Sequence, residues 1–135
     1  MPRDRTEMIT TLKPDEIFVF GSNTSGRHGR GAARQAYYDF GAEYGTGEGL
    51  TGQCYALPTL NGIYAQRTEI ELIESIRAFY RCAADNPKLT FLLTKVGTGL
   101  AGFDEQTMMR LFHAPVLFLC AAVPPPNIVW PEGWR

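Results

Sequence analysis

The 135-residue sequence predicts an α/β fold, a three-layer α/β/α sandwich around a mixed, mainly parallel sheet. Short β-rich runs alternate with segments of helical periodicity, in the order strand, helix, strand, helix, strand, helix. Crossover helices are the usual way to join parallel strands, so this alternation favours a parallel sheet. The length suits a single domain over residues 1–135, because two ordinary domains would need a longer chain.

The first strand and the first helix flank a glycine-rich loop. Residues 16–20 form a short β-rich run that the Gly-Ser-Asn tripeptide at 21–23 closes, and a helix is expected near residues 31–40. A second strand is expected over residues 53–57, ending at Pro58, because proline cannot donate a hydrogen bond to a neighbouring strand.

The second half of the chain begins with the strongest helix signal. Thr68 suits an N-cap, acidic residues follow in the first turn, and Asn86-Pro87 should end the helix. Its apolar stripe consists of Leu72, Ile76, Phe79, Tyr80 and Ala83. Residues 89–96 then predict a buried strand, 97–103 a loop and 104–112 a helix. Ligands in such sheets gather at the carboxyl ends of the strands, so the loops after Phe20 and Val96 should line one cleft.

Composition excludes several classes of function. The formal net charge of −1 argues against general binding of nucleic acid through its backbone. The apolar stretch 114–123 is shorter than the ~20 residues that span a bilayer, so we expect a core segment and no membrane anchor.

The cysteines and histidines give no sign of a metal or cofactor site. Cys54, Cys82 and Cys120 lack CxxC pairing, and only His28 and His113 are available as histidine ligands. With a polar N-terminus, this usage predicts a reducing, cytoplasmic setting. Cys54 lies in an apolar strand, which favours a buried structural thiol over a nucleophile.

The loop at residues 21–34 is the first candidate site. Its glycines and the following helix start can present backbone N–H groups to an anion, and Arg27, Arg30 and Arg34 can bind phosphate bidentately. His28 lies among glycines and arginines, so we expect it to be exposed and able to exchange a proton or bond a phosphate. The candidate ligand-binding residues are Gly21, Ser22, Asn23, Arg27, His28, Gly29, Arg30, Gly31 and Ala32. A tight turn with solvated arginines is the alternative.

The loop at residues 97–103, GTGLAGF, is the second candidate site. It holds a literal GxGxxG, but its late position and the lack of an acidic residue about 20 positions downstream argue against a nicotinamide dehydrogenase. The first loop likewise lacks the Lys and Ser/Thr of a P-loop. Asp104 and Glu105 would repel an anion placed too near them. The candidate ligand-binding residues are Gly97, Thr98, Gly99, Leu100, Ala101, Gly102 and Phe103.

The motifs FVFGSN, HGRGAA, FGAEYGTGEGLTGQCYALPT and VGTGLAGF, in this order and spacing, resemble the macro domain. More closely, they are similar to short bacterial and phage proteins with a macro-like pattern, over about residues 17–112. The resemblance implies a macro-like α/β/α fold that binds ADP-ribose or a related nucleotide. It implies that Asn23 faces the distal ribose, that Gly29, Gly31 and Ala32 border that ribose and the diphosphate, and that residues 97–103 form the second diphosphate loop.

The chain also departs from the macro pattern. Phe103 matches a residue that could stack over the sugar, but the acidic residue that contacts adenine has no clear counterpart, Asp15 and Glu16 being the nearest candidates. The first loop is more basic than usual, which would suit an extra phosphate or another nucleotide. Residues 115–126 differ from the usual final strand and helix.

We therefore expect an ADP-ribose-type nucleotide to bind between the two glycine-rich loops, with hydrolysis of an ADP-ribosyl or phosphate ester bond as an open further activity. In a hydrolase, Asn23 would position the attacking water and His28 would be the acid or base. The alternatives are non-catalytic sequestration of a nucleotide signal, or an interaction protein without a nucleotide ligand. Trp130 and Trp134 are expected to pack the C-terminus onto the body of the protein, whereas an exposed pair would mark the partner surface of such an interaction protein.

Overall fold

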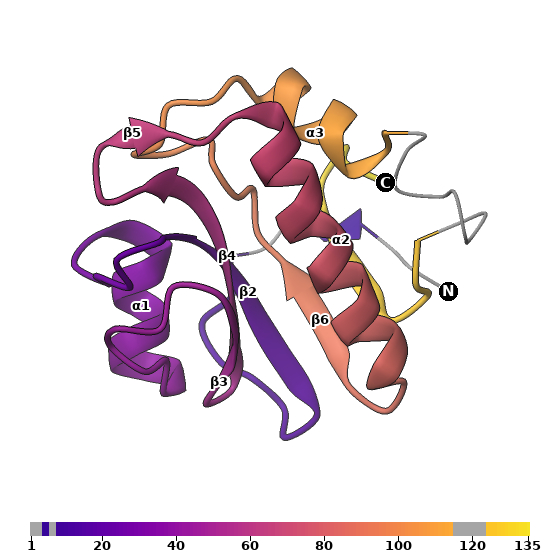
Figure 1. Ribbon diagram of the computed structural model, residues 1–135. Helices are drawn as coiled ribbons and strands as arrows, with labels where there is room; N and C mark the ends of the chain where they lie inside the picture. Colours follow the sequence, from indigo (N-terminus) through magenta and orange to yellow (C-terminus); the bar gives the residue numbers. More distant parts are fainter. Residues whose placement is uncertain (1–3, 6–7, 115–123) are drawn as a thin grey trace.

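The computed structural model describes residues 4–5, 8–114 and 124–135, which form a mixed sheet with helices on both faces (Figure 1). The described elements run in the order β1 (Asp4–Arg5), β2 (Glu16–Asn23), α1 (Gly31–Phe40), β3 (Gly49–Thr51), β4 (Cys54–Asn61), β5 (Ala65–Gln66), α2 (Glu69–Asp85), β6 (Thr90–Leu93), α3 (Glu105–Phe112) and β7 (Ile128–Pro131). The expected α/β class is confirmed.

The strands follow the order β1-β7-β6-β2-β4-β3, with β5 pairing to β4. The neighbouring strands β1, β7, β6, β2 and β4 are parallel to one another, whereas β3 and β5 run antiparallel to β4. Strand β2 lies between β6 and β4, with Phe18 opposite both Leu92 and Cys54. The sheet is therefore mixed and mainly parallel, as the sequence predicts.

Alternating side chains of β2 build a core on each face of the sheet. Phe18 and Phe20 belong to the apolar cluster that includes Ala33 and Ala36 of α1. Val19 and its neighbours on the other face pack with α2 and α3. Figure 1 shows α1 and α2 on opposite sides of the strands. This arrangement is compatible with the expected three-layer sandwich.

The helix boundaries agree closely with the sequence-based expectation. Helix α1 spans the expected residues, and α2 begins after Thr68 in a capping box that Glu71 completes. Helix α2 ends at Asp85 with the expected Asn86 as its C-cap, and its apolar stripe is buried. Asp104 caps α3, with its carboxylate accepting a hydrogen bond from the backbone N–H of Thr107. These helix ends are set by local contacts, which is why the sequence shows them.

The strand ends needed correction. Strand β2 continues through Asn23, and β4 continues past Pro58, so the expectation that Pro58 ends the strand is wrong. Pro58 lies opposite Ser22 of β2, where the register of the pair shifts, and such irregularities are places where a strand tolerates proline. Its carbonyl accepts a hydrogen bond from the guanidinium of Arg67 at 3.2 Å. Strand β6 is shorter than expected and ends at Leu93.

The C-terminal tryptophans are core residues. Trp130 and Trp134 are 1% and 0% exposed and pack against Phe112. The expectation that they pack the C-terminus onto the body of the protein is confirmed, and they offer no exposed partner surface. The stretch 115–123, expected to be a core segment, lies outside the described residues. No helix in the described ranges is long and apolar enough to cross a membrane.

Cys54 lies in the core beneath α1 and is fully buried. Burial raises the pKa of its thiol to about 12. A thiol that holds its proton so tightly is a poor nucleophile, and the expected structural role is confirmed.

Candidate functional site

A cleft of about 920 Å³ opens at the carboxyl ends of β2 and β6. The two strands are parallel neighbours, with Ile17 opposite Phe91 and Val19 opposite Leu93, so the loops that follow them leave the sheet at the same edge. Both glycine-rich loops line the cleft. The prediction that they share one cleft is confirmed.

Most of the residues singled out from the sequence lie on this cleft. The predicted residues that line it are Gly21, Ser22, Asn23, Arg27, Gly29, Arg30, Gly31 and Ala32 from the first loop and Gly97, Thr98, Gly99, Leu100 and Ala101 from the second. His28, Gly102 and Phe103 do not line it. The structure thus brings together side chains about 70 positions apart.

Two glycines set how closely the loops approach each other. A Cβ atom at Gly21 would lie 3.2 Å from the backbone nitrogen of Gly97. Gly97 has a φ of +80°, and a Cβ there would lie 3.1 Å from the sulfur of Met108. Side chains at these positions would push the loops apart or strain the second loop. The width of the cleft therefore depends on both glycines.

The N-terminus of α1 faces the cleft. Arg30 is its N-cap residue and makes no side-chain hydrogen bond to the first turn. Among the described residues, none accepts a hydrogen bond from the backbone N–H groups of Gly31, Ala32 and Ala33, all of which line the cleft. Free N–H groups and the helix dipole together favour an anion at this place.

The charged side chains that line the described cleft are all cationic. They are Arg27, Arg30 and Lys95, and no aspartate or glutamate in the described part of the chain lines it. This local charge contrasts with the nearly neutral sequence. In a partly enclosed space, a lining of one sign attracts ligands of the opposite sign.

Asn23 shapes the first loop. Its Nδ2 donates a hydrogen bond to the carbonyl of Arg27 at 2.9 Å, and the backbone N–H of Arg27 donates to its Oδ1 at 3.0 Å. The amide therefore closes a turn of the loop while lining the cleft. One Nδ2 hydrogen is left over that can reach a ligand.

His28 is not exposed, and that expectation is wrong. Its side chain is 1% exposed, its Nε2 donates a hydrogen bond to the carbonyl of Glu43 at 3.0 Å, and its ring packs edge-on against Phe20 and Tyr44. The segment after α1 folds back over the first loop and covers the imidazole. This burial could not be predicted from local sequence, because the covering residues lie about 15 positions away.

Phe103 and Gly102 close the second loop instead of facing the cleft. The backbone N–H of Phe103 donates to the carbonyl of Gly97 at 2.9 Å, and the ring packs against the core shared with α2 and α3. Gly102 donates to Gly99 at 3.0 Å. Phe103 therefore does not lie where it could stack on a sugar in the cleft.

Sequence reasoning missed a third wall of the cleft. Tyr44 reaches it from the segment between α1 and β3, and Ile63 and Tyr64 reach it from the turn after β4. Tyr44 is 55% exposed and Tyr64 is 88% exposed. The other lining residues missed are Ala33, Thr59, Leu60, Thr94, Lys95 and Val96. Strand β4 lies beside β2 and runs parallel to it, so the carboxyl end of β4 opens at the same edge of the sheet. The expected strand at residues 53–57 was therefore the signal that could have pointed to this wall.

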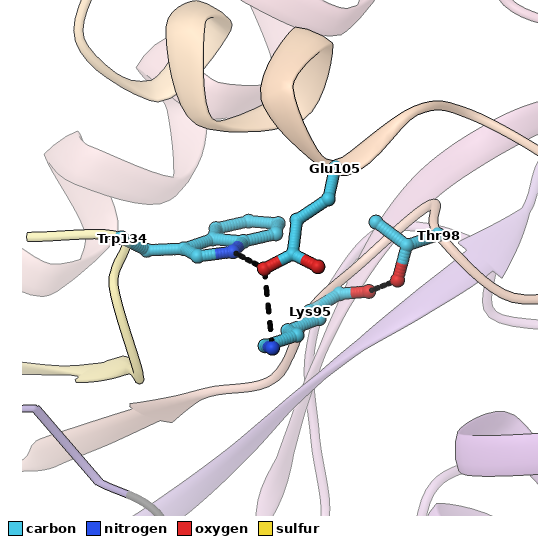
Figure 2. A network of polar contacts seen from close by, with 4 residues as sticks. All are labelled: Lys95, Thr98, Glu105 and Trp134. Atoms are coloured by element: carbon cyan, nitrogen blue, oxygen red, sulfur yellow. Dashed lines mark hydrogen bonds and ion pairs between the residues drawn. The ribbon is translucent and has the colours of Figure 1, made fainter.

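Lys95 belongs to a polar network at the start of the second loop (Figure 2). Its Nζ lies 3.1 Å from Oε1 of Glu105, and the indole N–H of Trp134 donates to the same oxygen at 3.0 Å. The hydroxyl of Thr98 donates to the carbonyl of Lys95 at 2.8 Å. The indole hydrogen bond and the ammonium of Lys95 hold the pKa of Glu105 below its usual value.

The fold and the cleft define an α/β protein with a cationic, glycine-lined cleft at the carboxyl edge of its parallel strands. No protein-family model matches the chain, and no curated protein matches it. The function of the cleft is therefore inferred from its own residues.

Proposed function

We propose that the cleft binds a phosphate-bearing nucleotide of the ADP-ribose type. The observation that carries this proposal is the convergence of two glycine-rich, strand-to-helix loops on one cleft whose charged lining is cationic. Its volume of about 920 Å³ falls within the range of small-molecule sites, which is roughly 300–1,000 Å³. The resemblance of the sequence motifs to macro domains makes ADP-ribose the first ligand to test.

The phosphates would lie between the two loops. On one side are the free N–H groups at the start of α1 together with Arg30. On the other side, no described residue accepts a hydrogen bond from the backbone N–H groups of Gly99, Leu100 and Ala101. Backbone donors facing a diphosphate from both sides would hold it without a metal ion.

The remaining walls suit the uncharged ends of such a ligand. Asn23 has an amide N–H available for a ribose hydroxyl. Tyr44 and Tyr64 offer exposed aromatic rings that could pack against a base. An elongated nucleotide with charge at its centre matches this distribution of groups.

We favour binding over hydrolysis. Among the described residues that line the cleft, none carries a carboxylate, an imidazole or a thiol that could act as a base. His28 is buried outside the lining, and Oδ1 of Asn23, the acceptor atom of its amide, already accepts a hydrogen bond from the backbone N–H of Arg27. Sequestration of a nucleotide is consistent with this set of groups.

Isothermal titration calorimetry with ADP-ribose, NAD, ADP, AMP, cyclic nucleotides and adenosine tests the proposal. We expect binding of ligands that carry a diphosphate, weaker binding at high salt, and no measurable binding of adenosine. The same mixtures, analysed by chromatography after incubation, should contain unchanged ligand. Failure of every phosphate-bearing ligand to bind would refute a nucleotide site, and steady conversion of one of them would refute binding without turnover.

A further inference from the structure

Lys95 differs from the other cations of the cleft. Among the described lining residues, Arg27 and Arg30 form no ion pair, whereas the ammonium of Lys95 is held by Glu105 at 3.1 Å. Figure 2 shows the lysine side chain extended toward Glu105, next to the indole of Trp134. Of the cationic residues that line the cleft, Lys95 is thus already paired with a carboxylate of α3, that of Glu105.

The ion pair between Lys95 and Glu105 should break easily. Both side chains are nearly half exposed, at 44% and 43%, and exposed ion pairs are weak because water screens them. Glu105 would not be left without a partner, since the indole N–H of Trp134 donates to the same oxygen. Release of Lys95 therefore leaves a solvated carboxylate that is still hydrogen-bonded.

The backbone of Lys95 is anchored, whereas its side chain is held by the exposed ion pair with Glu105. Its carbonyl accepts a hydrogen bond from the hydroxyl of Thr98, and also one from the backbone N–H of Thr98 at 3.3 Å. These bonds anchor the residue at the beginning of the second loop, beside Gly97. The four-carbon stem of lysine can then swing its ammonium between nearby acceptors.

We propose that Lys95 is a movable cation of the cleft, which Glu105 holds in the absence of ligand and which transfers to a phosphate bound at residues 97–101. Glu105 is then a positioning residue that limits affinity by competing for the ammonium. This inference rests on the proposed function, because it assumes that the cleft binds a phosphate-bearing nucleotide.

The competition predicts opposite effects of two substitutions on the Kd for ADP-ribose, measured by calorimetry. Lys95→Met should weaken binding about tenfold, through loss of a charge-assisted hydrogen bond. Glu105→Gln should tighten binding about threefold, because it frees the ammonium from a weak pair. A glutamine retains an oxygen that can accept the indole N–H, so the contact to Trp134 is preserved.

The double variant Lys95→Met/Glu105→Gln separates competition from a general charge effect. If Glu105 acts only by holding Lys95, the double variant binds as weakly as Lys95→Met alone. If the double variant instead binds about threefold more tightly than Lys95→Met, the negative charge of Glu105 repels the phosphate directly. The proposal that Glu105 competes for the ammonium of Lys95 is then refuted. Lys95→Arg keeps the charge and should retain more affinity than Lys95→Met.

The pair between Arg110 and Glu69 is the matched control. It is similarly exposed, at 59% and 54%, its atoms lie 2.7 Å apart, and neither residue lines the cleft. Arg110→Met and Glu69→Gln should leave the Kd unchanged, and circular dichroism should show all variants folded. If wild-type protein binds ADP-ribose and Lys95→Met and Glu105→Gln do not change the Kd, this inference alone fails. If wild-type protein binds no phosphate-bearing probe, both the proposed function and this inference fail.

Discussion

Single residues give the cleft its charge. Arg27 and Arg30 line it, and among the described residues neither guanidinium forms an ion pair. Arg30 is also the N-cap of α1, so its guanidinium and the helix dipole act at the same end of the helix. A guanidinium without a carboxylate partner is available for bidentate contact with phosphate.

Arg30→Ala should therefore weaken ADP-ribose binding by about 1.5–3 kcal/mol, the free energy of a charge-assisted hydrogen bond. Calorimetry measures the change. Arg81→Ala is the matched control, because Arg81 is exposed on α2 and lies outside the cleft lining. A Kd within error of wild type for Arg30→Ala would show that Arg30 is only a solvated surface residue.

Gly99 allows a test of backbone access without backbone strain. Its φ is not positive, and a Cβ atom there would meet no heavy atom within 4 Å. Gly99→Ala should thus fold normally and bind ADP-ribose about tenfold more weakly, and Gly99→Val should bind still more weakly, because the side chain blocks approach to the N–H groups. Unchanged binding in both folded variants would exclude backbone contact at this loop.

Gly31 is less suitable for the same experiment. Its φ is +59°, so a β-branched residue would strain the helix start even though the space is open. Gly31→Val should therefore lose stability as well as binding. Loss of binding in that variant would not separate blocked access from a damaged fold.

Among the elements, α2 has the best-defined start, and the start is tied to the sheet. Oε1 of Glu71 accepts hydrogen bonds from the backbone N–H of Thr68 at 2.9 Å and from the side-chain amide of Asn61 at 3.1 Å. Asn61 ends β4, next to Leu60 of the cleft lining. One carboxylate thus joins a helix cap to a wall of the cleft.

These contacts predict a pH dependence of stability. The hydrogen bond from the backbone of Thr68, followed by that from Asn61, lowers the pKa of Glu71 in the folded protein. The unfolded state therefore binds a proton at higher pH, so the stabilisation is present above about pH 4.3 and is lost as the pH falls through the folded pKa. Below about pH 4.3, the Tm of wild-type protein should therefore fall more steeply with decreasing pH than the Tm of Glu71→Gln. Parallel Tm profiles would contradict this.

At the scale of the whole molecule, the sheet separates two cores, and Cys54 and Cys82 belong to different ones. Cys54 of β4 is fully buried against α1, and its Sγ lies 3.5 Å from the carbonyl of Phe40. Cys82 of α2 is only partly buried. A reagent can therefore reach Cys82 through small local motions, whereas Cys54 requires the sheet and α1 to separate.

We accordingly expect Cys54 to resist alkylation by iodoacetamide at pH 8, at least until denaturant unfolds the protein. Its pKa of about 12 leaves almost no thiolate, and its burial blocks access. Site-resolved mass spectrometry should show Cys82 modified earlier, with Cys54 following the global unfolding transition. Rapid modification of Cys54 in folded protein would show that α1 detaches locally.

The sequence by itself determined the helices and the meeting of the two glycine-rich loops. Thr68 and Asp104 cap helices within one turn of their own position, and such local contacts are visible as short motifs. The alternation of strands and helices implied parallel neighbours, and parallel strands open at one edge. Arg30 and Gly97 could therefore be assigned to one cleft before the structure was known.

The tertiary structure alone decided which side chains face that cleft. His28 is covered by a segment about 15 positions away, and Pro58 stays within β4 at the point where its register with β2 shifts. Lys95 and Trp134 share the carboxylate of Glu105 because β7, which precedes Trp134, pairs with β6, which precedes Lys95. Short motifs reflect backbone preferences within a few residues. Burial and strand pairing depend on packing between distant segments, and many different sequences are compatible with the same packing, so a single sequence does not reveal it.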